Sequence, residues 1–90
     1  MIGVVFFRDW NHCGFTDGTW LIDSRPRFGV TKRHLPEGYA EIFWLDDGDD
    51  AWLRAEARIG EPYSICSEFI CQCMGAACIL PWTLQRMLRR

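Results

Sequence analysis

The order of two kinds of segment along the chain limits its fold more than any other feature. Runs typical of β-strands all lie in the first half, at residues 3–7, 13–16, 19–23 and 39–45. Segments with apolar residues at helical spacing all lie in the second half, at 51–59, 65–74 and from Pro81 onward. Strands followed by helices predict an α+β domain over residues 1–90, with a small antiparallel sheet followed by two or three helices.

A β-hairpin is predicted around Asp17 and Gly18, a pair favoured in two-residue type I′ turns. A turn of that length makes His12 and Asp23 direct cross-strand partners, with Cβ atoms about 5 Å apart. We therefore expect the Asp23 carboxylate to contact the His12 ring. The basic segment 31–35 is predicted to be a loop, with His34 facing solvent.

The helix boundaries are marked by residues that commonly begin or end helices. The acidic segment 46–50 offers an N-cap for the first helix, and Gly60 and Pro62 follow its end. Ser64 can cap the second helix, and Gly75 lies near the end of that helix.

Composition restricts the class of protein. Hydrophobic residues make up 49% and charged residues 24%, which excludes a disordered or fibrous chain. The net charge of −2 gives no electrostatic basis for binding nucleic acid. No apolar run approaches the roughly 20 residues of a membrane-spanning helix, and residues 1–7 are too short for a signal peptide. We expect a protein that is cytoplasmic as synthesised, with no nucleic-acid partner and no membrane span.

Five cysteines in such a chain indicate thiol chemistry, metal binding or burial, and not a disulfide framework. Cys66 is the strongest candidate for a functional thiol. It falls in the first turn of the predicted helix 65–74, where unpaired backbone N–H groups favour a thiolate. Those groups, the backbone N–H of Cys66 among them, would also stabilise an oxyanion. The alternative is a buried structural cysteine.

A thiolate nucleophile needs a base, and the chain holds only two histidines, His12 and His34. His12 paired with Asp23 would complete a Cys-His-acid triad with Cys66. The alternative for His12 and Asp23 is a surface ion pair. Trp10, beside His12, is the tryptophan that we expect to line a cleft.

The remaining cysteines leave a metal site open. Four thiols, at Cys66, Cys71, Cys73 and Cys78, would supply enough ligands for zinc or an iron–sulfur cluster. No Cys-x2-Cys pair occurs, however, and Cys66 and Cys71 do not share a face of a continuous helix. The spacing favours packing in the core, and we expect no cofactor.

The order of the motifs resembles the circularly permuted papain-like fold, which includes permuted relatives of NlpC-type cell-wall peptidases and the lecithin:retinol acyltransferase family. These proteins carry the histidine first on a strand, then a polar residue on the next strand, and the cysteine at a helix start. The matching positions, over about residues 3–75, are His12, Asp23, Gly60, Pro62, Tyr63, Cys66, Glu68 and Phe69. The resemblance implies Cys66 as nucleophile, His12 as general base and acid, Asp23 as the residue that orients His12, and Tyr63 as a cleft residue.

The resemblance also implies an activity. We expect a cysteine peptidase or amidase of papain-like type, or an acyltransferase, that attacks an amide or ester carbonyl. A peptidoglycan stem peptide is the first expected substrate, for a small member of phage or bacterial origin that is associated with the virion.

An alternative of a different class is a non-enzymatic assembly protein, such as a phage tail or neck component, that uses a degenerate papain-like fold to dock on protein partners. The short chain, its 14% aromatic residues and its basic last helix are typical of a subunit that completes its core against neighbours.

Overall fold

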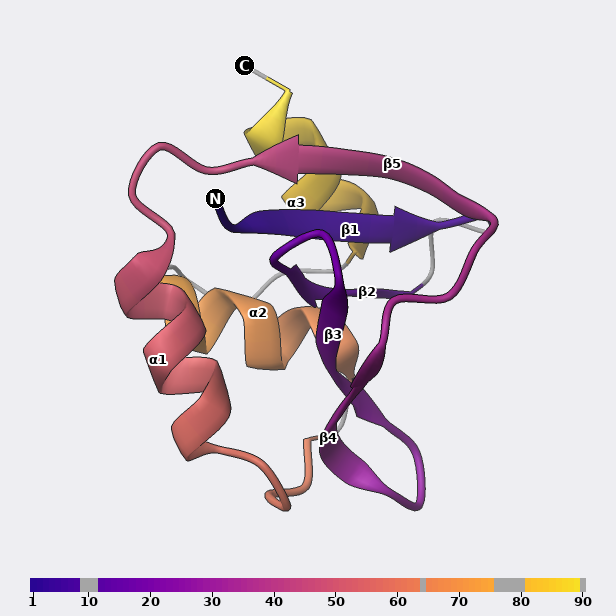
Figure 1. The fold of residues 1–90 in the computed structure, drawn as a ribbon, viewed down its shortest axis with the longest axis vertical. Helices are drawn as coiled ribbons and strands as arrows, with labels where there is room; N and C mark the ends of the chain where they lie inside the picture. Colours follow the sequence, from indigo (N-terminus) through magenta and orange to yellow (C-terminus); the bar gives the residue numbers. More distant parts are fainter. Residues whose placement is uncertain (9–11, 64, 76–80, 90) are drawn as a thin grey trace.

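The computed structural model describes residues 1–8, 12–63, 65–75 and 81–89 (Figure 1). The strands are β1 (Gly3–Phe7), β2 (Cys13–Thr16), β3 (Trp20–Arg25), β4 (Gly29–His34) and β5 (Tyr39–Trp44). The helices are α1 (Asp49–Ala57), α2 (Cys66–Met74) and α3 (Pro81–Leu88). The predicted α+β class, a small antiparallel sheet followed by helices, is confirmed.

The sheet has the strand order β4-β3-β2-β1-β5, with every neighbouring pair antiparallel. β1 to β4 follow one another as successive hairpins, and β5 returns to pair with the other side of β1. Phe6, Phe15 and Ile22 are buried in one cluster with Phe69 and Ile70 of α2. α2 lies against β2 and β3 (Figure 1), so the start of this helix is held close to the start of β2.

The turn of the β2–β3 hairpin differs from the prediction. Phe15 pairs with Ile22 and Thr16 with Leu21, so residues 17–20 form the connection in place of a two-residue turn. The reason is the Asp17 side chain, whose Oδ1 accepts hydrogen bonds from the backbone N–H groups of residues 19 and 20, at 2.9 and 2.8 Å. The register is shifted by two residues from the predicted one. A shift of two keeps every side chain on its predicted face.

Segment 31–35 was predicted to be a loop, and this prediction is wrong. It belongs mostly to β4, which pairs with β3 along one edge of the sheet. Charged side chains are common on edge strands, where they oppose pairing with other chains. Val30 is buried, whereas Lys32 and His34 are exposed. The His34 ring stacks on Trp20 with centroids 4.1 Å apart.

The helices begin and end close to the predicted boundaries. α1 starts at Asp49 with Gly48 as its N-cap, and no acidic side chain caps it, which corrects that expectation. α2 starts at Cys66 and ends at Met74, and its C-cap Gly75 has a φ of 74°, the left-handed conformation typical of a helix end. The predicted cap of α2, Ser64, lies outside the described residues. Within the described part of the chain, no helix is long and apolar enough to cross a membrane.

Candidate functional site

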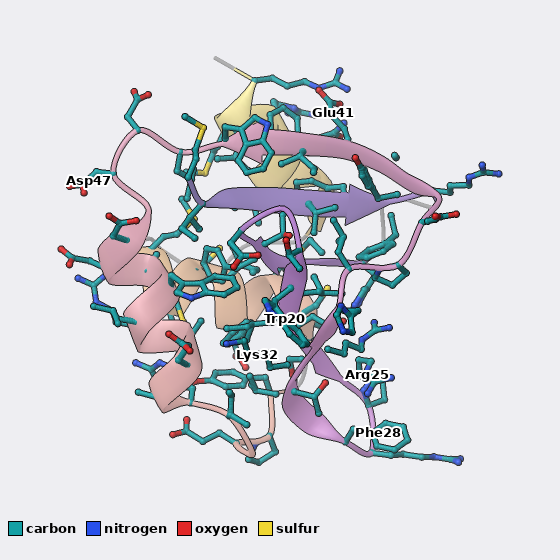
Figure 2. All side chains as sticks on the ribbon, in the orientation of Figure 1. Trp20, Arg25, Phe28, Lys32, Glu41 and Asp47 are labelled. Carbon is teal, nitrogen blue, oxygen red and sulfur yellow. The ribbon has the colours of Figure 1, made fainter. Side chains whose placement is uncertain are left out.

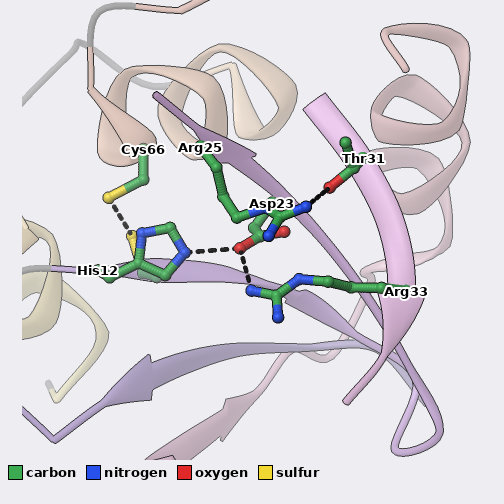
Figure 3. Close-up of polar contacts among 7 residues, drawn as sticks. His12, Asp23, Arg25, Thr31, Arg33 and Cys66 are labelled. Atoms are coloured by element: carbon green, nitrogen blue, oxygen red, sulfur yellow. Dashed lines mark hydrogen bonds and ion pairs between the residues drawn. The ribbon is translucent and has the colours of Figure 1, made fainter. Parts of the chain in front are cut away.

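Three side chains from distant parts of the sequence meet at the end of the sheet where β2 and α2 begin (Figure 3). His12 directly precedes β2, Asp23 lies in β3, and Cys66 is the first residue of α2. The His12 Nε2 atom lies 2.6 Å from the Asp23 Oδ2 atom. The Asp23 side chain is fully buried, while the His12 side chain keeps 27% of its surface exposed. The structure therefore brings together the three residues that the sequence singled out.

Local backbone features position His12 and Asp23. The Phe7 N–H donates a hydrogen bond to the His12 carbonyl at 3.1 Å, which closes the connection from β1 to β2. Continuing the β2–β3 register places Gly14 opposite Asp23. A Cβ on Gly14 would lie 2.8 Å from the Asp23 Cβ, so only glycine leaves room there. His12 therefore contacts Asp23 diagonally, across a position that has no side chain.

Arg33 is a member of this site that the sequence analysis missed. Its Nη2 atom donates to Asp23 Oδ2 at 3.0 Å, from the neighbouring strand β4 (Figure 3). The prediction of a loop at 31–35 hid this contact. The signal that could have revealed it is the pair of β-branched residues Val30 and Thr31, directly after the turn at Gly29.

The buried carboxylate remains ionised. Burial alone would raise the pKa of Asp23, but hydrogen bonds from His12 and Arg33 outweigh it and hold this pKa below its usual value. Both donors bind the same oxygen, Oδ2. The other oxygen, Oδ1, is buried and has no hydrogen-bond partner among the described residues. The negative charge of Asp23 therefore depends on two donors, one of which is the candidate base.

The thiol of Cys66 is strongly acidified. A hydrogen bond from the Cys13 thiol is the largest cause; burial opposes it, and a hydrogen bond from His12 acts in the same direction as Cys13. Together they lower the pKa of Cys66 to about 5. Hydrogen bonds with Asp23 and then Cys66 raise the pKa of His12 to about 9 despite its burial. At neutral pH the site therefore holds a thiolate beside an imidazolium, with His12 Nε2 on Asp23 and Nδ1 left for the sulfur.

The position of Cys66 in α2 adds to this effect. Cys66 follows the extended N-cap residue Ile65 and belongs to the first helical turn. The first N–H groups of a helix have no partner within it, and they carry a partial positive charge that favours an anion. Cys66 is 6% exposed, which leaves its sulfur at the edge of the core. The same N–H groups can receive negative charge that develops on a substrate oxygen.

Tyr63 lines a cavity of about 290 Å³ between the β3–β4 turn and the segment that leads into α2. Its ring packs on Phe69 of α2, with centroids 5.5 Å apart. The remaining lining residues are Arg25, Pro26, Arg27, Phe28, Gly29, Gly60 and Pro62. None of Cys66, His12 and Asp23 is among these lining residues, so the cavity is separate from the three contacting side chains. The other predicted cleft residue, Trp10, lies outside the described residues.

The cysteines of α2 do not assemble a ligand set within the described part of the chain. Cys71 and Cys73 are buried in the apolar cluster, and no three or more His, Cys, Asp or Glu side chains described here are grouped to hold a metal ion. Cys78, the fourth predicted ligand, lies outside the described residues. Cys71 and Cys73 thus belong to the core that fixes α2 on the sheet.

Comparison with protein-family models, curated proteins and solved structures gave no match for this chain. The chemistry of the site therefore rests on the contacts among Cys66, His12, Asp23 and Arg33.

Proposed function

We propose that the protein is a thiol hydrolase or acyltransferase in which Cys66 attacks the carbonyl carbon of an amide or ester. The observation that carries this proposal is the contact chain from Cys66 through His12 to the buried Asp23, with His12 Nε2 at 2.6 Å from Asp23 Oδ2. A nucleophile, a base and a group that orients the base are the three parts of a triad. The resemblance to permuted papain-like proteins supports the same roles.

The reaction would proceed in two steps. The Cys66 sulfur forms a bond to the carbonyl carbon, and the oxygen takes up negative charge near the first N–H groups of α2, including that of Cys66. His12 then donates its proton to the leaving amine or alcohol, which leaves a thioester on Cys66. In the second step His12 accepts a proton from water or another acceptor, which attacks the thioester and frees the product. Asp23 holds the ring and stabilises its positive charge throughout.

A peptidoglycan stem peptide is the substrate class that we propose first, for a protein of phage or bacterial origin that is associated with the virion. This choice follows from the resemblance to cell-wall peptidases. The cavity beside Tyr63 supports a peptide ligand, because Arg25 and Arg27 line it together with Phe28. Arginine pairs well with a carboxylate, and the aromatic rings suit the apolar part of a peptide. Arg25 and Phe28 lie together at the β3–β4 turn (Figure 2), with the guanidinium 4.7 Å from the ring centre.

The decisive experiment is the alkylation rate of each cysteine by iodoacetamide between about pH 5 and pH 9, mapped by mass spectrometry. At about pH 6 we expect Cys66 to react on the order of a hundredfold faster than an ordinary thiol. In His12→Ala this advantage should shrink, because the Cys13 hydrogen bond remains as the largest cause of the low pKa of Cys66. His34→Ala, which changes the exposed histidine on β4, should keep the full advantage. If Cys66 reacts no faster than the other cysteines in the native protein, the proposed enzyme is wrong.

The substrate is tested separately with purified peptidoglycan fragments, by mass analysis of the products. We expect cleavage by the native protein and none by Cys66→Ala. Cys73→Ala is the matched control, because it removes a buried thiol from the same helix away from His12. A reactive Cys66 that cleaves no peptidoglycan fragment would keep the thiol site and overturn this substrate class.

A different feature favours the second candidate function, docking within an assembly. β5 is an edge strand, and its two terminal residues, Tyr39 and Trp44, are 41% and 46% exposed. Exposed aromatic side chains are common at protein–protein contacts. Sedimentation of Trp44→Ser against the native protein tests this function: a concentration-dependent oligomer that the substitution dissolves supports docking, and a monomer at all concentrations contradicts it.

A further inference from the structure

A second thiol lies beside the proposed nucleophile, and its sulfur forms no covalent bond in the acyl-transfer mechanism. Cys13 is the first residue of β2 and follows His12 directly. Its side chain is fully buried. The Cys13 Sγ atom lies 3.8 Å from the Cys66 Sγ atom. Two sulfurs that are 53 residues apart in the sequence are therefore in contact across the sheet–helix interface.

This contact is close to the geometry of a covalent bond. A disulfide has an S–S length of about 2.05 Å, so the two sulfurs need to approach by less than about 2 Å. Cys13 is the first residue of β2, and Cys66 is the first residue of α2. Each sulfur therefore lies at the end of its strand or helix and not in the middle of it. Closing the gap requires a rotation of the side chains and a shift of the first turn of α2.

The two thiols also differ in the way that a two-step oxidation requires. Cys66 is 6% exposed and Cys13 is fully buried, so of the two residues only Cys66 borders solvent, and it is the one that we expect an oxidant to meet first. The hydrogen bond with Cys66 and burial raise the pKa of Cys13 well above its usual value, so Cys13 stays a thiol. A thiolate is the form that peroxides oxidise. Oxidation of Cys66 removes the negative sulfur that is the main cause of the raised pKa of Cys13, and Cys13 can then lose its proton as it condenses with the sulfenic acid.

We propose that Cys66 and Cys13 form a two-cysteine redox centre, in which a hydroperoxide oxidises Cys66 and Cys13 then closes a disulfide with it. This inference rests on the contact between the two sulfurs and does not need the acyl-transfer activity. If both are correct, the disulfide blocks the nucleophile, so the same oxidation stops acyl transfer.

The chemistry balances in two steps. The Cys66 thiolate attacks one peroxide oxygen; the O–O bond breaks, an S–O bond forms, and the departing alkoxide takes a proton from the His12 imidazolium to leave as an alcohol. The Cys13 sulfur then attacks the sulfur of the Cys66 sulfenic acid; an S–S bond forms, the S–O bond breaks, and the hydroxyl leaves as water with the Cys13 proton. The peroxide gains two electrons, one from each sulfur. A dithiol reductant returns them and restores both thiols.

The test treats the fully reduced chain with one equivalent of hydrogen peroxide, followed by peptide mapping without reductant. We expect the protein to lose two of its five thiols and to yield one linked peptide pair that contains Cys13 and Cys66. A dithiol should reverse the change. This part uses only the native protein, so it does not depend on the folding of any variant. A sulfenic acid on Cys66 that persists in the native protein, or a link from Cys66 to another cysteine, would overturn the proposal.

A variant series identifies the resolving thiol. In Cys13→Ser we expect about tenfold more Cys66 sulfenic acid, trapped by dimedone, because no thiol competes with the trap. Cys73→Ser is the matched control and should form the Cys13–Cys66 link as the native protein does. Equal trapping in Cys13→Ser and the native protein would contradict the role of Cys13. A failed link together with fast alkylation of Cys66 would leave the proposed enzyme standing, so the two proposals fail separately.

Discussion

Gly14 lies opposite Asp23 across the β2–β3 pair, and a Cβ added to it would come within 2.8 Å of the Asp23 Cβ. The same Cβ would lie 2.7 Å from Leu21 Cδ1 and 2.9 Å from the carbonyl oxygen of Ile22. Because one of these neighbours is backbone, the strand cannot yield by a simple side-chain rotation. The space that glycine leaves is what allows Asp23 to reach His12.

Gly14→Ala is therefore expected to displace Asp23 and to weaken its hydrogen bond with His12. The forced contact should lower the free energy of unfolding by roughly 1–3 kcal/mol, measured in urea. It should also move the rise of Cys66 alkylation to higher pH, since His12 loses its partner. Gly3→Ala is the matched control: its Cβ would lie 2.7 Å from Ile42 Cγ2, away from the site, so it should destabilise without moving the alkylation profile.

Asp23→Asn tests the electrostatic role of the buried carboxylate. The hydrogen bond with Asp23 is the largest cause of the raised pKa of His12, so the neutral amide should lower that pKa from about 9. A less positive His12 stabilises the thiolate less, and the pKa of Cys66 should rise from about 5. The pH dependence of Cys66 alkylation measures this directly. Asp50→Asn, in the first turn of α1, should leave the profile unchanged, and an equal shift in both variants would refute the assignment.

Arg33→Gln is expected to destabilise the protein because it removes one of the two donors to Asp23 Oδ2. Leaving a buried acceptor short of a partner costs roughly 1–3 kcal/mol. Lys32→Gln is the control on the same strand: its pair with Glu56 at 3.2 Å is largely exposed, and such pairs contribute about 0–1 kcal/mol. Urea unfolding measures the free energy of unfolding of both variants. An equal decrease in the two would show that the Arg33–Asp23 pair stabilises the protein no more than the Lys32–Glu56 pair does.

The free energy of unfolding that Asp23 contributes should decrease at low pH. Its pKa is lower in the folded state than the value of about 3.9 expected for an unfolded chain. The stability it contributes is therefore fully present above about pH 4 and is lost as the pH falls through the lower folded-state pKa. We expect the difference in unfolding free energy between the native protein and Asp23→Asn to shrink as the pH falls below about 4. A difference that stays constant from neutral to acidic pH would contradict this.

The sequence predicted the His12–Asp23 contact from a hairpin register that is wrong by two residues. The contact survived because side chains alternate with a period of two, so His12 and Asp23 remain on one face in either register. His12 and Asp23 are no longer directly opposite each other, and they meet diagonally because Gly14, which lies opposite Asp23, has no side chain. A register error of one residue would have separated the pair.

Other parts of the site depend on tertiary packing that local patterns do not carry. Arg33 was missed because four of the five residues at 31–35 are polar or basic, which is typical of a loop and equally of an edge strand. The Cys13–Cys66 contact was missed because it requires knowing that α2 packs on β2 with their first residues together. By contrast, local backbone properties were enough to predict two helix boundaries. Gly75 marks the end of α2 because glycine readily adopts a left-handed φ, and Pro81 marks the start of α3 because proline has a fixed φ.

The connection between the two edges of the sheet has a consequence for the whole molecule. Residues 35–38 join β4 at one edge to β5 at the other. In a flat sheet those edges would be about 19 Å apart. The chain from His34 to Tyr39 spans no more than roughly 17 Å even when fully extended. The sheet therefore curls between these two edges instead of lying flat.

This curl explains why a carboxylate is buried on the side of the sheet away from the helices. Val5, Leu21 and Asp23 are all fully buried, yet none belongs to the cluster that packs against α2. They lie on the face of the sheet opposite that cluster, where Asp23 contacts His12 and Arg33. Residues of the sheet and beside it, His12 and Arg33 among them, keep Asp23 from water, so the burial of this carboxylate depends on the curl of the strands.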